Sequence, residues 1–260
     1  MTKILTALLF SLCAILSAQA QYTILNTHSH NDYEQKVPFF TAYNAHFGSI
    51  EADIWAVNGV LYVAHDSADI KPSRTLESLY LQPIVKFFRQ NGGKAWKDYP
   101  STFQLLIDLK TGVEPTLSLL VKELGKYPDV FGLNGNKIGI PVVITGNRPN
   151  PSDFSKYPLN ISFDGHLDLK YDKAQLKRLA LFSEDLEVFT MWKGETAIPQ
   201  KEEMRLKQIV DSVHGLNKKI RFWDAPDAPN AWKTMMNLKV DFINTDHIQE
   251  LATYLKTHKN

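Results

Sequence analysis

Two carboxylates lie two residues apart in the segment SIEADIW, where a single alanine separates Glu51 from Asp53. In a β-strand, residues i and i+2 point to the same face, so both carboxylates would converge on one side of a sheet. Carboxylates this close repel each other and cannot both stay ionised without a cation. Hard oxygen ligands suit Mg²⁺ or Ca²⁺, so we interpret the pair as metal ligands. A solvent-facing alternation on an edge strand is the alternative.

A third acid lies in the apolar segment LLIDLKTG, where Asp108 is followed two residues later by Lys110. An acid inside a buried parallel strand is costly unless it is paired or bound to a metal. We interpret Asp108 as the third metal ligand and Lys110, on the same face of the strand, as a phosphate contact. A structural ion pair between Asp108 and a lysine or arginine is the alternative.

Histidines flank these acids in two segments, THSHND with His28 and His30, and VLYVAHD with His65. Two histidines at one site could transfer protons on both sides of a phosphodiester. The competing interpretation is a His-x-His zinc clamp formed by His28 and His30, as in amidohydrolase-type or PHP-type hydrolases. That clamp needs further nitrogen ligands and gives no reason for the three carboxylates, so the acid–base interpretation is favoured.

Two further residues are candidate substrate contacts. Arg148, in ITGNRP, could bind phosphate oxygens in bidentate fashion, and a salt bridge is an equal alternative. Trp223, in KIRFW, could form an aromatic wall for a ligand, or it could pack under a loop.

The elements that must position these residues alternate between strand and helix patterns. Apolar periodicity predicts helices over 116–128 and 199–217. The predicted strands cover 22–27, 49–57, 60–65, 103–109, 140–146, 160–165, 186–192, 219–223 and 240–245. This alternation predicts a (β/α)₈ barrel, with an open doubly wound sheet as the alternative. Polar residues gather where the predicted strands end, which is where a barrel places its active site.

The N-terminus has the pattern of a secretory signal peptide. Lys3 precedes an apolar run over 4–16, and small residues at Ala18 and Ala20 predict cleavage after Ala20. We therefore expect a secreted or periplasmic protein whose residues 21–260 form one catalytic domain. The lone cysteine, Cys13, would be removed with the signal peptide, so no disulfide is expected.

Bulk composition is that of an ordinary globular protein of 260 residues, with a net charge of +1. This charge gives no electrostatic reason to expect binding to nucleic acid or to an anionic membrane surface. Beyond residue 20 no apolar run reaches the ~18 residues needed to span a bilayer. We expect a monomer without a transmembrane segment.

The series THSHN, SIEADI, LYVAHD, LLIDLKTG and FINTD resembles the superfamily of glycerophosphodiester phosphodiesterases and phosphatidylinositol-specific phospholipases C. The resemblance covers residues 24 to about 247. It implies a (β/α)₈ barrel with His28 and His65 as the catalytic pair and Glu51, Asp53 and Asp108 around one divalent cation. Lys110 would contact the substrate phosphate.

The details differ from a typical glycerophosphodiesterase. The usual His-Arg-Gly after the first strand reads His28-Ser29-His30, so its phosphate-binding arginine is missing there, and Asp108 replaces the usual glutamate. HxxN, formed by His28 and Asn31, and DLKTG are similar to the sphingomyelinase D branch, and we count Asn31 among the substrate contacts. The whole pattern is most similar to a little-characterised group that includes secreted bacterial members and fungal mitochondria-inheritance proteins.

We therefore expect a secreted, metal-dependent phosphoric diester hydrolase with a role in lipid metabolism. It would cleave a glycerophosphodiester or the headgroup of a lysophospholipid or phospholipid by acid–base catalysis with two histidines. Two alternatives stay open: a zinc-dependent hydrolase that uses His28 and His30, and a non-catalytic exported binding protein on a barrel that has lost its activity.

Overall fold

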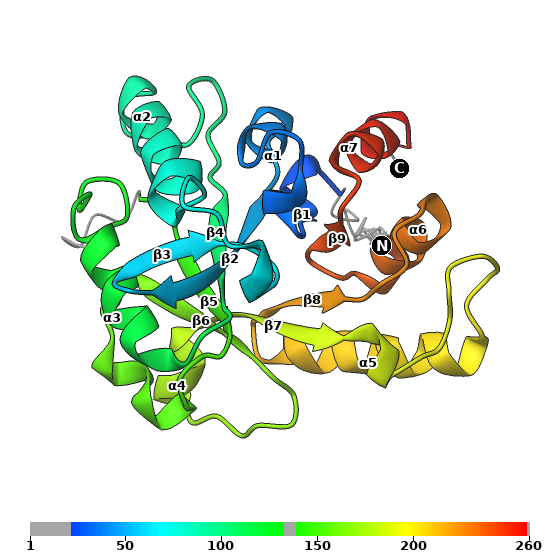
Figure 1. Ribbon diagram of the computed structural model, residues 1–260. Coiled ribbons are helices and arrows are strands. Elements are labelled where there is room, and N and C mark those ends of the chain that lie inside the picture. Colours follow the sequence, from blue (N-terminus) through cyan, green and yellow to red (C-terminus); the bar gives the residue numbers. More distant parts are fainter. Residues whose placement is uncertain (1–21, 133–138, 259–260) are drawn as a thin grey trace, which may run out of the picture.

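Parallel strands form one strongly curved sheet in the computed structural model, which describes residues 22–132 and 139–258 (Figure 1). The sheet order is β8-β7-β6-β5-β4-β2-β1-β9, and β3 pairs antiparallel with β2 outside this series. The predicted signal peptide lies outside the described residues. The strands are β1 (Thr27–Ser29), β2 (Ser49–Val57), β3 (Val60–Val63), β4 (Gln104–Leu109), β5 (Val142–Gly146), β6 (Ile161–Gly165), β7 (Leu179–Asp185), β8 (Lys219–Trp223) and β9 (Ile243–Thr245).

The sheet nearly closes into a barrel. β1 pairs in parallel with both β2 and β9, so the first strand lies beside the last. Between β8 and β9 a parallel bridge joins Arg221 to Phe242, and the Ile220 carbonyl accepts a hydrogen bond from the Asp241 amide at 3.1 Å. This arrangement confirms the predicted eight-stranded barrel and excludes the open doubly wound sheet.

Helices surround the sheet and cover its outer face (Figure 1). The apolar residues of β2 show how the two faces differ, because Ile50, Ala52 and Ile54 are fully buried against the helical layer. The residues between them therefore point into the barrel. The helices are α1 (Phe40–Ala45), α2 (Gln82–Gln90), α3 (Val113–Leu124), α4 (Lys173–Arg178), α5 (Gln200–Gly215), α6 (Pro229–Leu238) and α7 (Ile248–Thr257).

Helix α5 confirms the helix predicted after Pro199, and α3 confirms most of the one predicted over 116–128. In α5 the residues Leu206, Val210 and Val213 are buried, as the spacing requires. None of the helices among the described residues is long and apolar enough to cross a membrane.

The strand predicted over 186–192 is wrong. The actual strand, β7, covers the preceding residues, and the chain turns into a short 3₁₀ helix over Leu186–Val188. The Asp185 side chain causes this turn by accepting a hydrogen bond from the Glu187 amide at 2.8 Å. The strand predicted over 22–27 is also largely wrong, because Ile24–Asn26 is a 3₁₀ helix and β1 begins at Thr27.

Candidate metal and acid–base centre

The three predicted metal ligands lie together at the mouth of the barrel. Glu51 and Asp53 point inward from β2, and Asp108 lies directly beside Asp53 on the neighbouring strand β4. Each of the three offers an oxygen within 4.8 Å of the oxygens offered by the other two. Glu51 and Asp53 are buried and Asp108 is half-buried, so the edge-strand alternative for the pair on β2 is wrong.

Lys110 lies between two of these carboxylates. Its Nζ is 2.9 Å from Asp53 Oδ2 and 3.1 Å from Asp108 Oδ2. Burial lowers the pKa of Lys110, and the two carboxylates raise it by more, so the ammonium stays charged. Burial and the charges of Glu51 and Asp108 raise the pKa of Asp53 to about 6, as expected for crowded acids.

The donor set fits a hard divalent cation. Asp53 Oδ1 is buried and finds no hydrogen-bond partner among the described residues, so it has an unused lone pair beside the other carboxylates. Gly146, with a φ of +70°, leaves the space that Asp108 occupies, because a Cβ there would lie 1.9 Å from Asp108 Oδ1. Three oxygen donors of this type match Mg²⁺ or Ca²⁺.

His28 lies deeper in the barrel than the carboxylates and is fully buried. Its Nδ1 is 2.7 Å from Ser49 Oγ, and its Nε2 is 2.8 Å from Glu51 Oε2. Burial and the nearby Arg221 charge lower the pKa of His28 to about 4. The imidazole is therefore neutral at neutral pH and fixed at both ring nitrogens.

Arg221 is the main residue of the centre that the sequence did not reveal. It points inward from β8, is 3% exposed, and donates from Nε to Ser183 Oγ at 2.9 Å. Its Nη1 contacts His28 Nε2 and lies 3.4 Å from Glu51 Oε2. The sequence did contain one indication of its position. Arg221 comes two residues before the candidate Trp223, and residues two apart on a strand share a face.

His65 is the exposed histidine of the centre, with 58% of its side chain accessible. Its Nδ1 lies 3.0 Å from the Tyr33 hydroxyl and 3.3 Å from Asp53 Oδ2. Tyr33, also missed from the sequence, is buried, and its hydroxyl lies 2.7 Å from the same Asp53 oxygen. Both contacts of the ring use Nδ1, which leaves Nε2 for a proton transfer at the mouth.

His30 and Asn31 lie at the mouth beside Tyr33, whose hydroxyl is 2.7 Å from Asn31 Oδ1. His30 Nδ1 lies 2.9 Å from Asp246 Oδ1, and the Asn31 amide nitrogen lies 3.1 Å from the same ring nitrogen. Burial lowers the pKa of His30, but the hydrogen bond to Asp246 and the negative charges of Glu51 and Asp246 together raise it above its ordinary value. The rings of His28 and His30 are 6.5 Å apart at their centroids, with their nitrogens turned to different carboxylates.

Arg148 forms a salt bridge, which is one of the two interpretations that its sequence context left open. Its Nε lies 3.2 Å from Asp164 Oδ1, and the fully buried Asp164 also accepts from Thr145 Oγ1 at 2.7 Å. Trp223 is half-buried where β8 ends. Arg148 follows β5, which pairs directly with β4 and its Asp108, whereas Trp223 ends β8, three strands further along the sheet.

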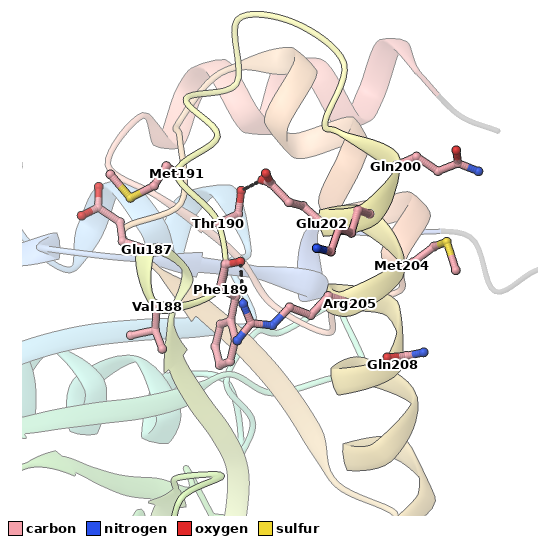
Figure 2. Close-up of a pocket in the computed structure, with 11 residues that line it drawn as sticks. Glu187, Val188, Phe189, Thr190, Met191, Gln200, Glu202, Met204, Arg205 and Gln208 are labelled. Carbon is pink, nitrogen blue, oxygen red and sulfur yellow. Dashed lines mark hydrogen bonds between the residues drawn. The ribbon is translucent and has the colours of Figure 1, made fainter.

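A groove of about 830 Å³ lies outside this centre, between the loop after β7 and the start of α5. Figure 2 shows its polar links, in which Thr190 bonds to Glu202 and Arg205 donates to the Phe189 carbonyl at 3.2 Å. None of the predicted site residues lines this groove. The chemistry of the described residues therefore points to the charged mouth and not to this groove.

Two family models match the chain. The model described as "AIM6-like phosphodiesterase domain" matches residues 17–150, which include the three carboxylates, His28 and His65. The model described as "Glycerophosphoryl diester phosphodiesterase family" matches residues 219–249, which include Arg221 and Trp223.

Fungal proteins are similar over most of the chain. "Altered inheritance of mitochondria protein 6 homolog" from Arthroderma benhamiae is 27% identical over 87% of this chain and 82% of its own length. "Altered inheritance of mitochondria protein 6" from Kluyveromyces lactis is 27% identical over 89% of this chain and 72% of its own.

Among solved structures, a glycerophosphodiester phosphodiesterase from Parabacteroides distasonis is similar with a TM-score of 0.55. The match covers 89% of this chain and 98% of that one at 16% identity. This likeness supports the barrel fold.

Proposed function

The chain belongs to the AIM6-like phosphodiesterase family, and we propose that it is an exported phosphodiesterase whose Glu51, Asp53 and Asp108 hold one Mg²⁺ or Ca²⁺. The substrate is a glycerophosphodiester or a phospholipid with a phosphodiester headgroup. The observation that carries this proposal is the convergence of three carboxylate oxygens within 4.8 Å at the barrel mouth, next to Lys110 and His65.

The cation would supply charge neutralisation at the phosphate and would favour deprotonation of a bound hydroxyl. Lys110 stands at the edge of the carboxylate cluster, where its ammonium can contact a non-bridging phosphate oxygen as negative charge develops. Asn31, Arg148 and Trp223 remain proposed substrate contacts around the mouth.

His65 is the proposed proton-transferring group on the solvent side of the phosphate. Tyr33 and Asp53 hold its Nδ1, so Nε2 can reach a leaving or attacking oxygen. His28 is the proposed partner on the inner side, where Ser49 holds Nδ1 of its neutral imidazole. Its Nε2 would accept a proton only when the Glu51 carboxylate, which it contacts in this structure, is drawn to a bound cation. The nucleophile is a hydroxyl next to the phosphate in the substrate, so the first product is a cyclic phosphate.

The experiment is product release from glycerophosphocholine, glycerophosphoinositol and lysophosphatidylcholine, with Mg²⁺, Ca²⁺, Zn²⁺ or EDTA. Bis-p-nitrophenyl phosphate, which has no hydroxyl next to its phosphate, is the comparison that reports direct attack by water. We expect turnover that needs Mg²⁺ or Ca²⁺ and disappears in Asp53→Asn and in His28→Ala. Full turnover in EDTA, or near-normal rates in either variant, would contradict the proposal.

The zinc-hydrolase alternative has less support. Among the described residues, the cluster of three possible metal ligands is made of carboxylates alone, and no histidine takes part in it. Zinc bound in the purified protein and lost in His30→Ala would restore this alternative.

A further inference from the structure

Arg221 places a permanent positive charge inside the barrel, below the carboxylate cluster. Its Nε is bound to Ser183 Oγ on the neighbouring strand, so the guanidinium is fixed in place. Its Nη1 faces Glu51 Oε2 and Asn244 Oδ1, each at 3.4 Å, and contacts the His28 ring. A guanidinium stays protonated in proteins, so this charge is present at every working pH.

The two cations of the centre approach the carboxylates from different sides. Lys110 contacts Asp53 and Asp108 at the mouth, whereas Arg221 approaches Glu51 from the interior. At neutral pH three carboxylates and two cations leave one net negative charge. A bound divalent cation changes this to one net positive charge, which matches the single negative charge of a phosphodiester. Without Arg221 the loaded centre would be neutral.

We propose that Arg221 is a positioning residue that sets this balance, so that the centre with one divalent cation attracts a phosphodiester monoanion. This inference rests on the proposed function, because it assumes a cation at Glu51, Asp53 and Asp108. Arg221 need not touch the substrate to act in this way, since its charge lies within a few ångströms of the cluster.

The charge role and a purely structural role predict opposite changes in metal affinity. If Arg221 tunes charge, Arg221→Met removes a repulsive neighbour, and Mg²⁺ binds at least as tightly as in the wild type. If Arg221 only holds Glu51 in place, the same variant binds Mg²⁺ more weakly. Arg221→Lys keeps the charge and serves as the matched control.

The experiment uses the whole protein and calorimetric titration, first with Mg²⁺ or Ca²⁺ and then, on the loaded protein, with dimethyl phosphate as a monoanionic phosphodiester. We expect Arg221→Met to keep or increase cation affinity and to bind dimethyl phosphate at least about tenfold more weakly. Arg221→Lys should stay within about threefold of the wild type in both titrations.

Weaker cation binding in Arg221→Met, or unchanged binding of dimethyl phosphate, would overturn the inference. If Arg221→Met does not fold, the lysine variant decides, because a tenfold loss of dimethyl phosphate binding in a folded protein of equal charge contradicts the charge argument. A wild type that binds no divalent cation would overturn the proposed function and this inference together.

Discussion

The two ends of the barrel interior differ sharply in chemistry. The end near the strand N-termini is filled by Leu106, Val143, Leu181 and Phe242, which form a buried apolar cluster of their own. The opposite end holds the three carboxylates with Lys110 and Arg221. The same strands supply both ends, since Leu106 and Asp108 are two residues apart on β4. The apolar end therefore stabilises the barrel, whereas the crowded charges at the other end lower its stability.

The largest effect on activity should come from the charged end. His65→Gln should lower kcat/KM by about 10²–10⁴-fold, because a proton-transferring group is lost. His247→Gln is a matched control, since both histidines have 58% side-chain exposure and a carboxylate oxygen at 3.3 Å. Steady-state kinetics on the substrate found in the panel would check this. Equal rates in the two variants would remove His65 from the mechanism.

The apolar end should show the largest effect on stability. Leu181→Ala creates a cavity in a fully buried cluster and should lower the free energy of unfolding by about 2–5 kcal/mol. Activity per folded molecule should stay close to that of the wild type. Urea unfolding and kinetics below the transition measure the two quantities. A large loss of activity in the folded variant would mean that the two ends are not independent.

Substitution of Gly146 tests whether the metal site depends on the space that this glycine leaves for the Asp108 side chain. Gly146→Ala and Gly59→Ala both place a side chain at positive φ, which costs about 1–2 kcal/mol each. Only at Gly146 does the new Cβ displace Asp108, because Gly59 has open space. Calorimetry should therefore show weaker Mg²⁺ or Ca²⁺ binding in Gly146→Ala alone. Equal cation affinities in the two variants would argue against Asp108 as a ligand.

A smaller effect concerns the pH dependence of stability without metal. Burial raises the pKa of Asp32 to about 6, above the ordinary value of 3.8, despite bonds from Ser29, Tyr80 and the Phe39 amide. The folded state then binds more protons than the unfolded state between about pH 4 and 6. Stability should fall as pH rises through this window, by at most about 1.4 kcal/mol per pH unit for this group.

Asp32→Asn should flatten this slope in urea unfolding with EDTA present. An unchanged slope would show that other buried acids, such as Asp164 with its pKa raised to about 6 by burial, account for the dependence.

Local patterns in the sequence predicted the barrel and the carboxylate cluster. Glu51 and Asp53 share a strand face, and Asp108 follows an apolar run, so their positions depended only on strand periodicity. Arg221 was missed because its partners His28 and Glu51 are 193 and 170 residues away in the chain. A pattern of neighbouring residues in the sequence cannot indicate a contact between residues so far apart in the chain.

The strand β7 was missed for a different reason. It begins at Leu179, directly after Arg178, the last residue of α4, so no turn residues separate the helix from the strand. The following residues 186–192 are rich in aromatic and β-branched types and resembled a strand more closely. The side chain of Asp185, which starts a helical turn, decided the local structure.

The central claim is that Glu51, Asp53 and Asp108 hold one divalent cation, and calorimetric titration of the metal-free protein tests it most directly. We predict one Mg²⁺ or Ca²⁺ per chain in the wild type. No measurable binding is expected in the triple variant that combines Glu51→Gln, Asp53→Asn and Asp108→Asn. Asp153→Asn, which alters a surface ion pair with Lys156, should bind like the wild type. Absence of binding in the wild type, or undiminished binding in the triple variant, would contradict the account.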